Sequence, residues 1–320
     1  MAGQRIDYID YLKGLSITWV VWYHTVHPWF VDFSFRIPLF FLASGIFFKV
    51  TDFGTYVRKK TKQLLIPFAF FTLIYYGYLL IQQYVASGSL CGFDFWCIFG
   101  VFEPHAGYKS FAVNPPLWFI CALICQQLMT WILVKTVRNR IAIFICAVVL
   151  TVIGAKFLWN KPTLFMFGRS LPYLVYYVSG YLFGKDLLNI IERRDNRSYW
   201  PLYAACAVFA VALLLKASVP SATRLLNYFE TFGLVVMLIY LFRFIHTWRI
   251  LRPLHFFGRN SYIVLGMHEI YQTVLLIAIN HMIGPVTVWT GMLQTTLTLL
   301  LLYPTIKLMN RYVPQFVGKA

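Results

Sequence analysis

Long apolar runs, separated by short connectors that carry the charges, dominate this sequence. Ten runs can be delimited, at residues 14–31, 36–49, 64–86, 117–135, 141–157, 169–185, 200–216, 229–245, 260–281 and 287–308. Several are close to the roughly twenty residues that a helix needs to cross the hydrocarbon core of a bilayer. The sequence therefore predicts an all-α, polytopic membrane protein with about ten transmembrane helices.

The low charge content limits what else the chain can contain. Charged residues make up only 12% of the 320 residues, whereas a soluble globular domain carries about 25%. This leaves no room for a large soluble domain, and we expect one membrane domain over residues 1–320. The net charge of +17 does not indicate nucleic-acid binding, because the charges form no contiguous basic domain.

The distribution of basic residues predicts the orientation of the helices. Lys and Arg collect in the cytoplasmic loops of membrane proteins. With the N-terminus in the cytoplasm, most of the 28 Lys and Arg residues fall on that side, so we expect both termini to be cytoplasmic. The short run 36–49 contains Pro38 and Gly45, which indicates a tilted or re-entrant helix. No internal repeat is evident, which disfavours the common inverted-repeat transporters.

The longest connection on the opposite side covers about residues 87–116. Connections of this length are often functional, although a passive lid explains the loop equally well. Cys91 and Cys97 lie in it and could form a disulfide if the loop faces an oxidising compartment.

The segment Arg5–His24, RIDYIDYLKGLSITWVVWYH, combines charges with an apolar run. Lys13 and His24 are eleven residues apart, which is roughly 16 Å on a helix and about half of a bilayer core. We therefore expect one helix to hold Lys13 at the membrane edge and His24 in mid-helix, deep in the membrane. An ionisable side chain at that depth is costly and indicates a function.

This segment resembles the first transmembrane helix of acyltransferase family 3, in which a basic residue, more often Arg, precedes a His at this spacing. Other stretches match in order: FRIPLFFLASG at Phe35–Gly45, a basic cluster before Pro67, PLWF at Pro116–Phe119 and GRNSY…H at Gly258–His268. The family comprises integral membrane O-acetyltransferases of surface carbohydrates, and the short chain is similar to the fucose-4-O-acetylase-like members. The resemblance implies acetyl-CoA as donor and a carbohydrate as acceptor.

The chain departs from the family pattern at two places. The resemblance implies an R-x-x-R-like pair in the basic cluster, where this chain has Lys59 and Lys62. Lys binds phosphate as a point charge rather than as a bidentate fork. An acidic residue is often found further along the helix that follows Pro116, where this chain has Gln126 and Gln127, so no acidic role is carried over.

His24 is the candidate catalytic residue. A buried neutral imidazole can act as a general base on a sugar hydroxyl or can accept the acyl group itself, and both routes stay open. The alternative is a structural role, because a lone His on an apolar helix face is more often a residue whose hydrogen bonds are satisfied within the protein. His27, one turn later, is a candidate for orienting His24 or for binding substrate.

Basic residues at the predicted cytoplasmic surface are the candidates for donor binding. The phosphates of coenzyme A need several cations, and the candidates are Lys13, Lys59, Lys60 and Lys62. The same residues would otherwise contact anionic lipid headgroups. Asp10 is expected to pair with Arg5 or Lys13 and to hold this entrance together.

The remaining candidates concern the acceptor. Arg36 could clamp the sugar or donate to a developing oxyanion, or could extend to the membrane interface. His268 and Glu269 lie within the run 260–281, where ionisable groups are costly unless they line a cavity. As neighbours they cannot point the same way, and we expect His268 rather than Glu269 to face the cavity. Glu230 is a weaker candidate for acceptor binding.

These interpretations favour an O-acyltransferase of a bacterial inner membrane that moves an acetyl group from cytoplasmic acetyl-CoA to a hydroxyl of a cell-surface carbohydrate or its precursor. No metal site is expected. The alternative is a secondary transporter or channel for a small anion or sugar, in which the buried His and Glu relay protons. The spacing of Lys13 and His24 favours the enzyme.

Overall fold

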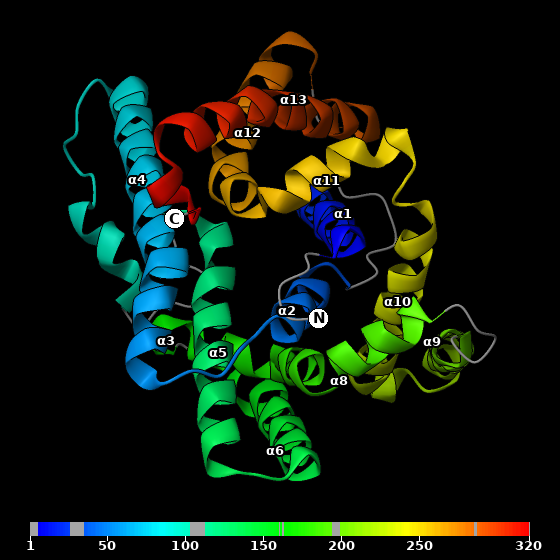
Figure 1. The fold of residues 1–320 in the computed structure, drawn as a ribbon. Coiled ribbons are helices and arrows are strands. Elements are labelled where there is room, and N and C mark those ends of the chain that lie inside the picture. Colours follow the sequence, from blue (N-terminus) through cyan, green and yellow to red (C-terminus); the bar gives the residue numbers. More distant parts are fainter. Residues whose placement is uncertain are drawn as a thin grey trace. The chain divides into compact units, whose positions relative to one another are not determined.

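A computed structural model describes residues 6–25, 35–102, 113–159, 161, 163–193, 199–284 and 287–319 of the chain. Within these ranges all regular secondary structure is helical (Figure 1). The prediction of an all-α protein is confirmed.

Seven helical stretches among the described residues are long and apolar enough to cross a membrane. They are Phe53–Ser87, Pro115–Thr136, Arg140–Leu158, Trp200–Ser218, Pro220–Ile245, Ser261–Met282 and Val288–Tyr312. Each coincides with one of the ten predicted runs, which confirms the polytopic membrane class. The cytoplasmic location of the termini stays a prediction.

The other three predicted runs correspond to α1 (Asp7–Tyr23), α2 (Arg36–Ile46) and α8 (Leu174–Glu192). The 11 residues of α2 span about 16 Å, too little to cross a core of about 30 Å. The short second helix is thus as predicted.

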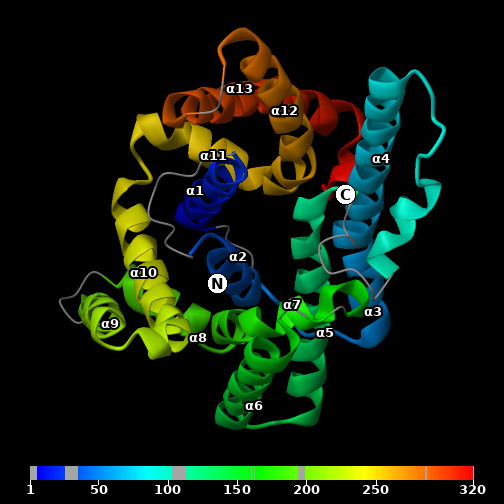
Figure 2. The same cartoon turned by 180° about the vertical axis from the view of Figure 1, so that it is seen from behind.

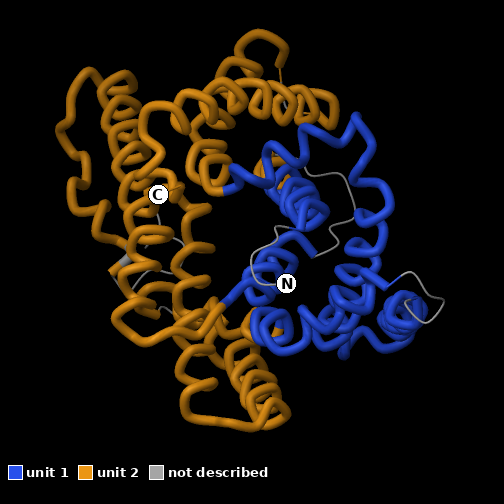
Figure 3. Tube along the Cα trace, viewed as in Figure 1, with its two compact units in different colours: residues 1–20, 30–48, 176–261 blue, residues 21–29, 49–175, 262–320 orange. Residues whose placement is uncertain are grey.

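The chain divides into two compact units (Figure 3). Unit 1 comprises Met1–Val20, Phe30–Phe48 and Tyr176–Ser261, and unit 2 comprises Val21–Trp29, Lys49–Val175 and Tyr262–Ala320. The single domain over residues 1–320 stays a prediction.

Unit 1 is held together by close helix contacts at glycines. A Cβ added at Gly258 of α11 (Arg252–Arg259) would lie 1.8 Å from the backbone carbonyl oxygen of Asp10, and one at Gly14 equally close to that of Leu254. Small residues allow helix backbones to approach this closely in membranes. Gly14 and Gly258, which belong to the stretches that resemble the family, therefore serve the packing of α1 on α11.

Two further helices of unit 1, α9 (Trp200–Ser218) and α10 (Thr223–Ile245), form a hairpin. Inside it, the ammonium of Lys216 pairs with the carboxylate of Glu230, which is 7% exposed. A buried carboxylate on a membrane-crossing helix needs such a partner.

Unit 2 contains a long helix with a π-helical turn. α3 (Phe53–Lys60) passes through Thr61–Leu65 into α4 (Ile66–Ser87), and the backbone N–H of Ile66 donates to the carbonyl of Thr61. Pro67 cannot donate to the carbonyl four residues before it, which explains a local change of hydrogen bonding here. The hydroxyl of Tyr262 donates to the carbonyl of Leu64 over 2.8 Å.

The other long or short α-helices described in unit 2 are α5 (Trp118–Thr136), α6 (Arg140–Ile153), α7 (Phe167–Ser170), α12 (Ser261–Met282) and α13 (Val288–Tyr312). Figures 1 and 2 both show α13 next to α12, and the hydroxyl groups of Tyr271 and Thr305 are hydrogen-bonded between them over 2.6 Å. Cys91 and Cys97, whose pairing the sequence left open, are both free thiols.

Candidate functional site

His24 directly follows the end of α1. The helix ends at Tyr23, and the backbone N–H of Thr25 donates to the carbonyl of Trp22 over 3.1 Å. The predicted mid-helix position of His24 is therefore wrong. The sequence contains a reason, because a proline clashes with the carbonyl four residues before it in a continuing helix, and Pro28 stands four residues after His24. The side chain of His24 is 31% exposed rather than buried.

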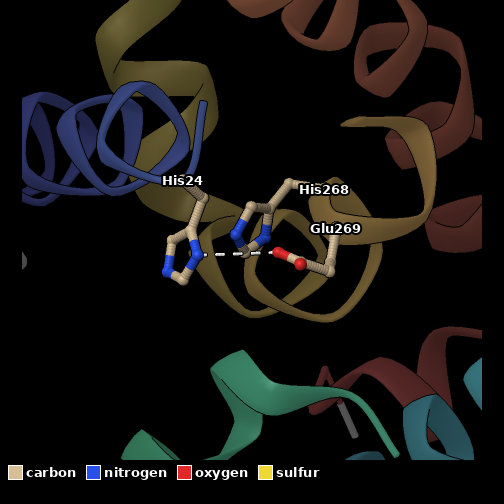
Figure 4. Close-up of side chains that lie close together, drawn as sticks. All are labelled: His24, His268 and Glu269. Atoms are coloured by element: carbon tan, nitrogen blue, oxygen red, sulfur yellow. Dashed lines mark ion pairs between the residues drawn. The ribbon is translucent and has the colours of Figure 1, made fainter. Parts of the chain in front are cut away.

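Two consecutive side chains of α12 lie beside His24 (Figure 4). Oε2 of Glu269 is 3.6 Å from Nδ1 of His24, and the ring centroids of His24 and His268 are 5.2 Å apart in an edge-to-face arrangement. All three residues belong to unit 2. The expectation that only His268 would face the site is corrected, since both residues reach His24.

His268 is fully buried and oriented by its own helix. Its Nδ1 lies 2.9 Å from the carbonyl oxygen of Val264 and 3.1 Å from that of Leu265, so Nδ1 carries the proton of the neutral ring. Nε2 is then an acceptor, and it is buried without a hydrogen-bond partner among the described residues. Such a group is expected where a ligand or a water completes the hydrogen bonding.

The contact between Glu269 and His24 is longer than a hydrogen bond. Oε2 of Glu269 is buried and makes no hydrogen bond within the part of the chain that the structure describes. In substrate-free enzymes, catalytic hydrogen bonds are often long and shorten when substrate binds. The pair is therefore a carboxylate aimed at one nitrogen of an accessible imidazole.

Two buried glutamines connect this site to its surroundings. Nε2 of Gln272 donates to the backbone carbonyl of Val21 over 2.6 Å, and Nε2 of Gln294 donates to the carbonyl of Gln272 over 2.9 Å. The first bond ties α12 to the last turn of α1, three residues before His24. Neither glutamine was predicted as a site residue, although Gln272 follows His268 by four residues and so shares its helix face.

Asn114 and Gly266 set the distance between α12 and α4. Nδ2 of Asn114 donates to the carbonyl of Gly266 over 2.9 Å. A Cβ at Gly266 would lie 2.4 Å from the ring of Phe71. This close approach comes two residues before His268, so it determines where His268 and Glu269 lie.

The same trio also has the composition of a metal site. One ligand atom from each of His24, His268 and Glu269 lies within 4.8 Å of the other two. Imidazole and carboxylate ligands suit zinc, and a His with its other nitrogen on a backbone carbonyl is common among metal ligands. The absence of a metal, expected from the sequence, stays a prediction.

Lys13 belongs to unit 1. Its Nζ lies 3.8 Å from Oδ1 of Asp10 and 5.3 Å from the ring centroid of Phe47. One of the two pairings expected for Asp10 is thus present. Arg5, the other expected partner, lies outside the described residues.

The basic cluster of Lys59, Lys60 and Lys62 belongs to unit 2. It lies in the last turn of α3 and in the π-helical turn, with Lys59 and Lys62 exposed and Lys60 half-buried. Turns of this type are frequent at functional sites. A donor site shared by this cluster and Lys13 stays a prediction.

The remaining candidates for acceptor binding are Arg36, Glu230 and His27. Arg36 begins α2, and its backbone carbonyl accepts a hydrogen bond from the hydroxyl of Ser16. The charge of Glu230 is already balanced by Lys216, so a role in acceptor binding would require this pair to open. Arg36 and Glu230 both belong to unit 1. His27 lies outside the described residues.

Comparison with known proteins adds one match. A family model described as an acyltransferase domain, Acyl_transf_3, matches residues 6–306. This range contains every candidate residue named above except Arg5. Searches of curated proteins and of solved structures found no match.

Proposed function

This chain belongs to acyltransferase family 3, and we propose that it is an O-acetyltransferase that moves an acetyl group from acetyl-CoA to a hydroxyl of a cell-surface carbohydrate or its precursor. Family membership supports acyltransferase activity, and seven long apolar helices support a location in a membrane. The donor, the acceptor and the bacterial inner membrane are parts of the proposal.

One observation carries the proposal, the position of the Glu269 carboxylate at Nδ1 of His24. A carboxylate there favours the tautomer with the proton on Nδ1 and leaves Nε2 as the basic nitrogen. Figure 4 shows the second ring nitrogen of His24 turned away from Glu269. An accessible basic nitrogen held by a carboxylate is the arrangement that general-base catalysis needs.

In the proposed reaction, Nε2 of His24 removes the proton of the acceptor hydroxyl while the hydroxyl oxygen attacks the thioester carbonyl carbon. The new C–O bond forms, the C–S bond breaks, and the proton passes from the imidazolium to the departing thiolate. Glu269 stabilises the imidazolium between these two proton transfers. The buried acceptor Nε2 of His268 suits a second hydroxyl of the carbohydrate.

A route through an acyl-histidine uses the same nitrogen. In that route Nε2 attacks the thioester and then passes the acetyl group to the hydroxyl. Mass spectrometry of rapidly quenched protein distinguishes the two routes, because only the second leaves an acetyl group on His24 in the absence of acceptor.

The test is a thiol-release assay on the full chain in lipid nanodiscs. With acetyl-CoA and a panel of glycans, we expect thiol release that depends on one glycan class, together with the acetylated glycan. His24→Ala should lower the rate by about 10² to 10⁴ while acetyl-CoA binding persists. No glycan-dependent release, combined with proton-coupled uptake into proteoliposomes, would overturn the proposal in favour of transport.

A further inference from the structure

The segment after α4 folds back along that helix. α4 ends at Ser87, and residues Phe95–Phe102, FWCIFGVF, form a 3₁₀ helix. The hydroxyl of Tyr76 donates to the carbonyl of Phe95 over 3.2 Å, and the rings of Tyr76 and Phe93 are 5.8 Å apart. Figures 1 and 2 both show this segment beside α4. The chain therefore returns from the end of α4 to the level of Tyr76.

The sequence of α4 indicates how deep that level is. Residues 64–81 contain no charged or amide side chain, whereas Lys62 and Gln63 precede them and Gln82 and Gln83 follow. Eighteen helical residues rise about 27 Å, close to a hydrocarbon core of about 30 Å. Tyr76 stands six residues before Gln82, about 9 Å inside this boundary. Its side chain leans toward the N-terminal end of the helix, which is deeper still.

The outer face of the 3₁₀ helix is aromatic. Its most exposed large side chains are Trp96 at 72% and Phe102 at 60%, followed by Phe95 and Phe99, each above half. The one charged residue in the sequence of 90–102 is Asp94, and its Oδ1 accepts a hydrogen bond from the backbone N–H of Trp96 over 3.0 Å. An exposed cluster of four large rings is unusual for a water-facing loop and marks an interaction site.

The neighbouring surface of α4 identifies the partner. This helix also exposes large apolar side chains, namely Leu73, Ile81, Tyr84 and Val85. Because α4 belongs to a candidate membrane span, this face contacts lipid. Residues 95–102 lie beside this helix (Figures 1 and 2), and their exposed side chains are apolar as well.

We propose that residues 90–102 form a re-entrant hairpin whose Trp96, Phe99 and Phe102 rings insert among the acyl chains of the bilayer. A segment at this depth must satisfy its own backbone polar groups. The 3₁₀ hydrogen bonds do so within the helix, and the Tyr76 hydroxyl serves the carbonyl of Phe95. The predicted outer connection 87–116 thus begins with a segment inside the membrane.

The test measures membrane depth with single nitroxide labels in nanodiscs of phosphatidylcholine and phosphatidylglycerol. The six native cysteines are free thiols and are replaced by Ala in the background. Labels go to Trp96→Cys and Phe99→Cys, with Leu73→Cys on α4 as the lipid control and Ser89→Cys in the exposed turn as the water control. The measurement is independent of acyl transfer.

We expect the labels at positions 96 and 99 to collide with oxygen more than with a water-soluble nickel chelate, as at position 73. The label at position 89 should show the reverse. Nickel accessibility at both 96 and 99 equal to that at 89 would overturn the proposal. Using two positions guards against the loss of either variant through misfolding, and monodisperse elution establishes that each labelled protein is folded.

Discussion

The side-chain amide of Gln272 donates to the backbone carbonyl of Val21 over 2.6 Å. Val21 lies one helical turn before His24, and Gln272 lies on the helix that carries Glu269. This hydrogen bond therefore links the segment that leads to His24, the proposed base, to the helix that carries Glu269. If this hydrogen bond were lost, the side chains of His24 and Glu269 would shift relative to each other.

We expect Gln272→Leu to lower kcat by about tenfold or more, because displacements near 1 Å can cost up to about a hundredfold. Loss of one buried hydrogen bond should cost about 1 kcal/mol of stability. Gln126→Leu is the matched control, because Gln126 is also buried and donates to the carbonyl of Ser170 over 2.8 Å. Both variants should lower the Tm in detergent similarly. Equal losses of kcat would show that the role of Gln272 is only structural.

The carboxylate of Glu269 should matter for turnover more than for donor binding. Glu269→Gln keeps the size of the side chain and can still accept from Nδ1 of His24, but it cannot balance the charge of the imidazolium. We expect kcat to fall while KM for acetyl-CoA stays unchanged, and Glu269→Asp to restore part of the rate. Steady-state thiol release measures both constants. A higher KM with an unchanged kcat would place Glu269 in substrate binding instead.

The membrane class and seven of the helices could be predicted because a span requires a long apolar run, which is visible in any sequence. The end of α1 was missed because the run 14–31 stays apolar past His24, and Pro28 is the one residue of that stretch whose chemistry argues against a continuing helix. Ionisable residues within apolar runs stand out, so His24, His268 and Glu269 could all be named. Their contact could not be predicted, because it depends on long-range contacts of α12, such as the hydrogen bond of Gln272 to Val21 and that of Asn114 to Gly266.

The close contacts at glycines could not be predicted from the sequence either. Gly14 and Gly258 are visible in the sequence, but their function depends on a helix crossing that no local pattern reveals. The pair of Lys216 and Glu230 likewise requires the hairpin of α9 and α10. Long-range packing, rather than local propensity, decides these positions.

We expect Gly258→Ala to prevent stable folding. The added Cβ would meet the backbone carbonyl of Asp10 at 1.8 Å, and a helix backbone cannot move aside as a flexible side chain can. Overpacking of this kind costs about 1–3 kcal/mol or more. Gly77→Ala in α4 is the control, since nothing lies within 4 Å of its added Cβ. Size-exclusion profiles should show aggregation for the first variant only, and a wild-type profile for Gly258→Ala would contradict the close crossing.

Chelators should leave acetyl transfer unchanged. The carboxylate and the imidazole can supply the base without a metal, although His24, His268 and Glu269 have the composition of a zinc site. We expect equal activity before and after dialysis against EDTA and 1,10-phenanthroline, and less than stoichiometric zinc in elemental analysis. Two results together would assign the trio to metal binding. The native protein would contain stoichiometric zinc and lose it together with its activity, and the Glu269→Gln variant would contain no zinc.

The basic cluster should bind the phosphates of the donor. Replacing Lys59, Lys60 and Lys62 together by Ala should weaken acetyl-CoA binding by about tenfold, because three charge contacts near the surface contribute roughly 0.5 kcal/mol each. The affinity of the native chain should fall with added salt, and this dependence should be weaker in the triple variant. Lys13→Ala, measured separately, should also weaken binding.

The control for this prediction is a triple Ala variant of Lys135 in the last turn of α5, Arg138 in the connection that follows, and Arg140, the first residue of α6. If the lysine cluster only contacted lipid headgroups, both triple variants would bind acetyl-CoA as the native chain does. Acetyl-dephospho-CoA, which lacks the 3′-phosphate, gives the sharper comparison. It should bind the native chain more weakly than acetyl-CoA does, whereas the two donors should bind the lysine variant with similar affinity, because the cations that distinguish them are gone.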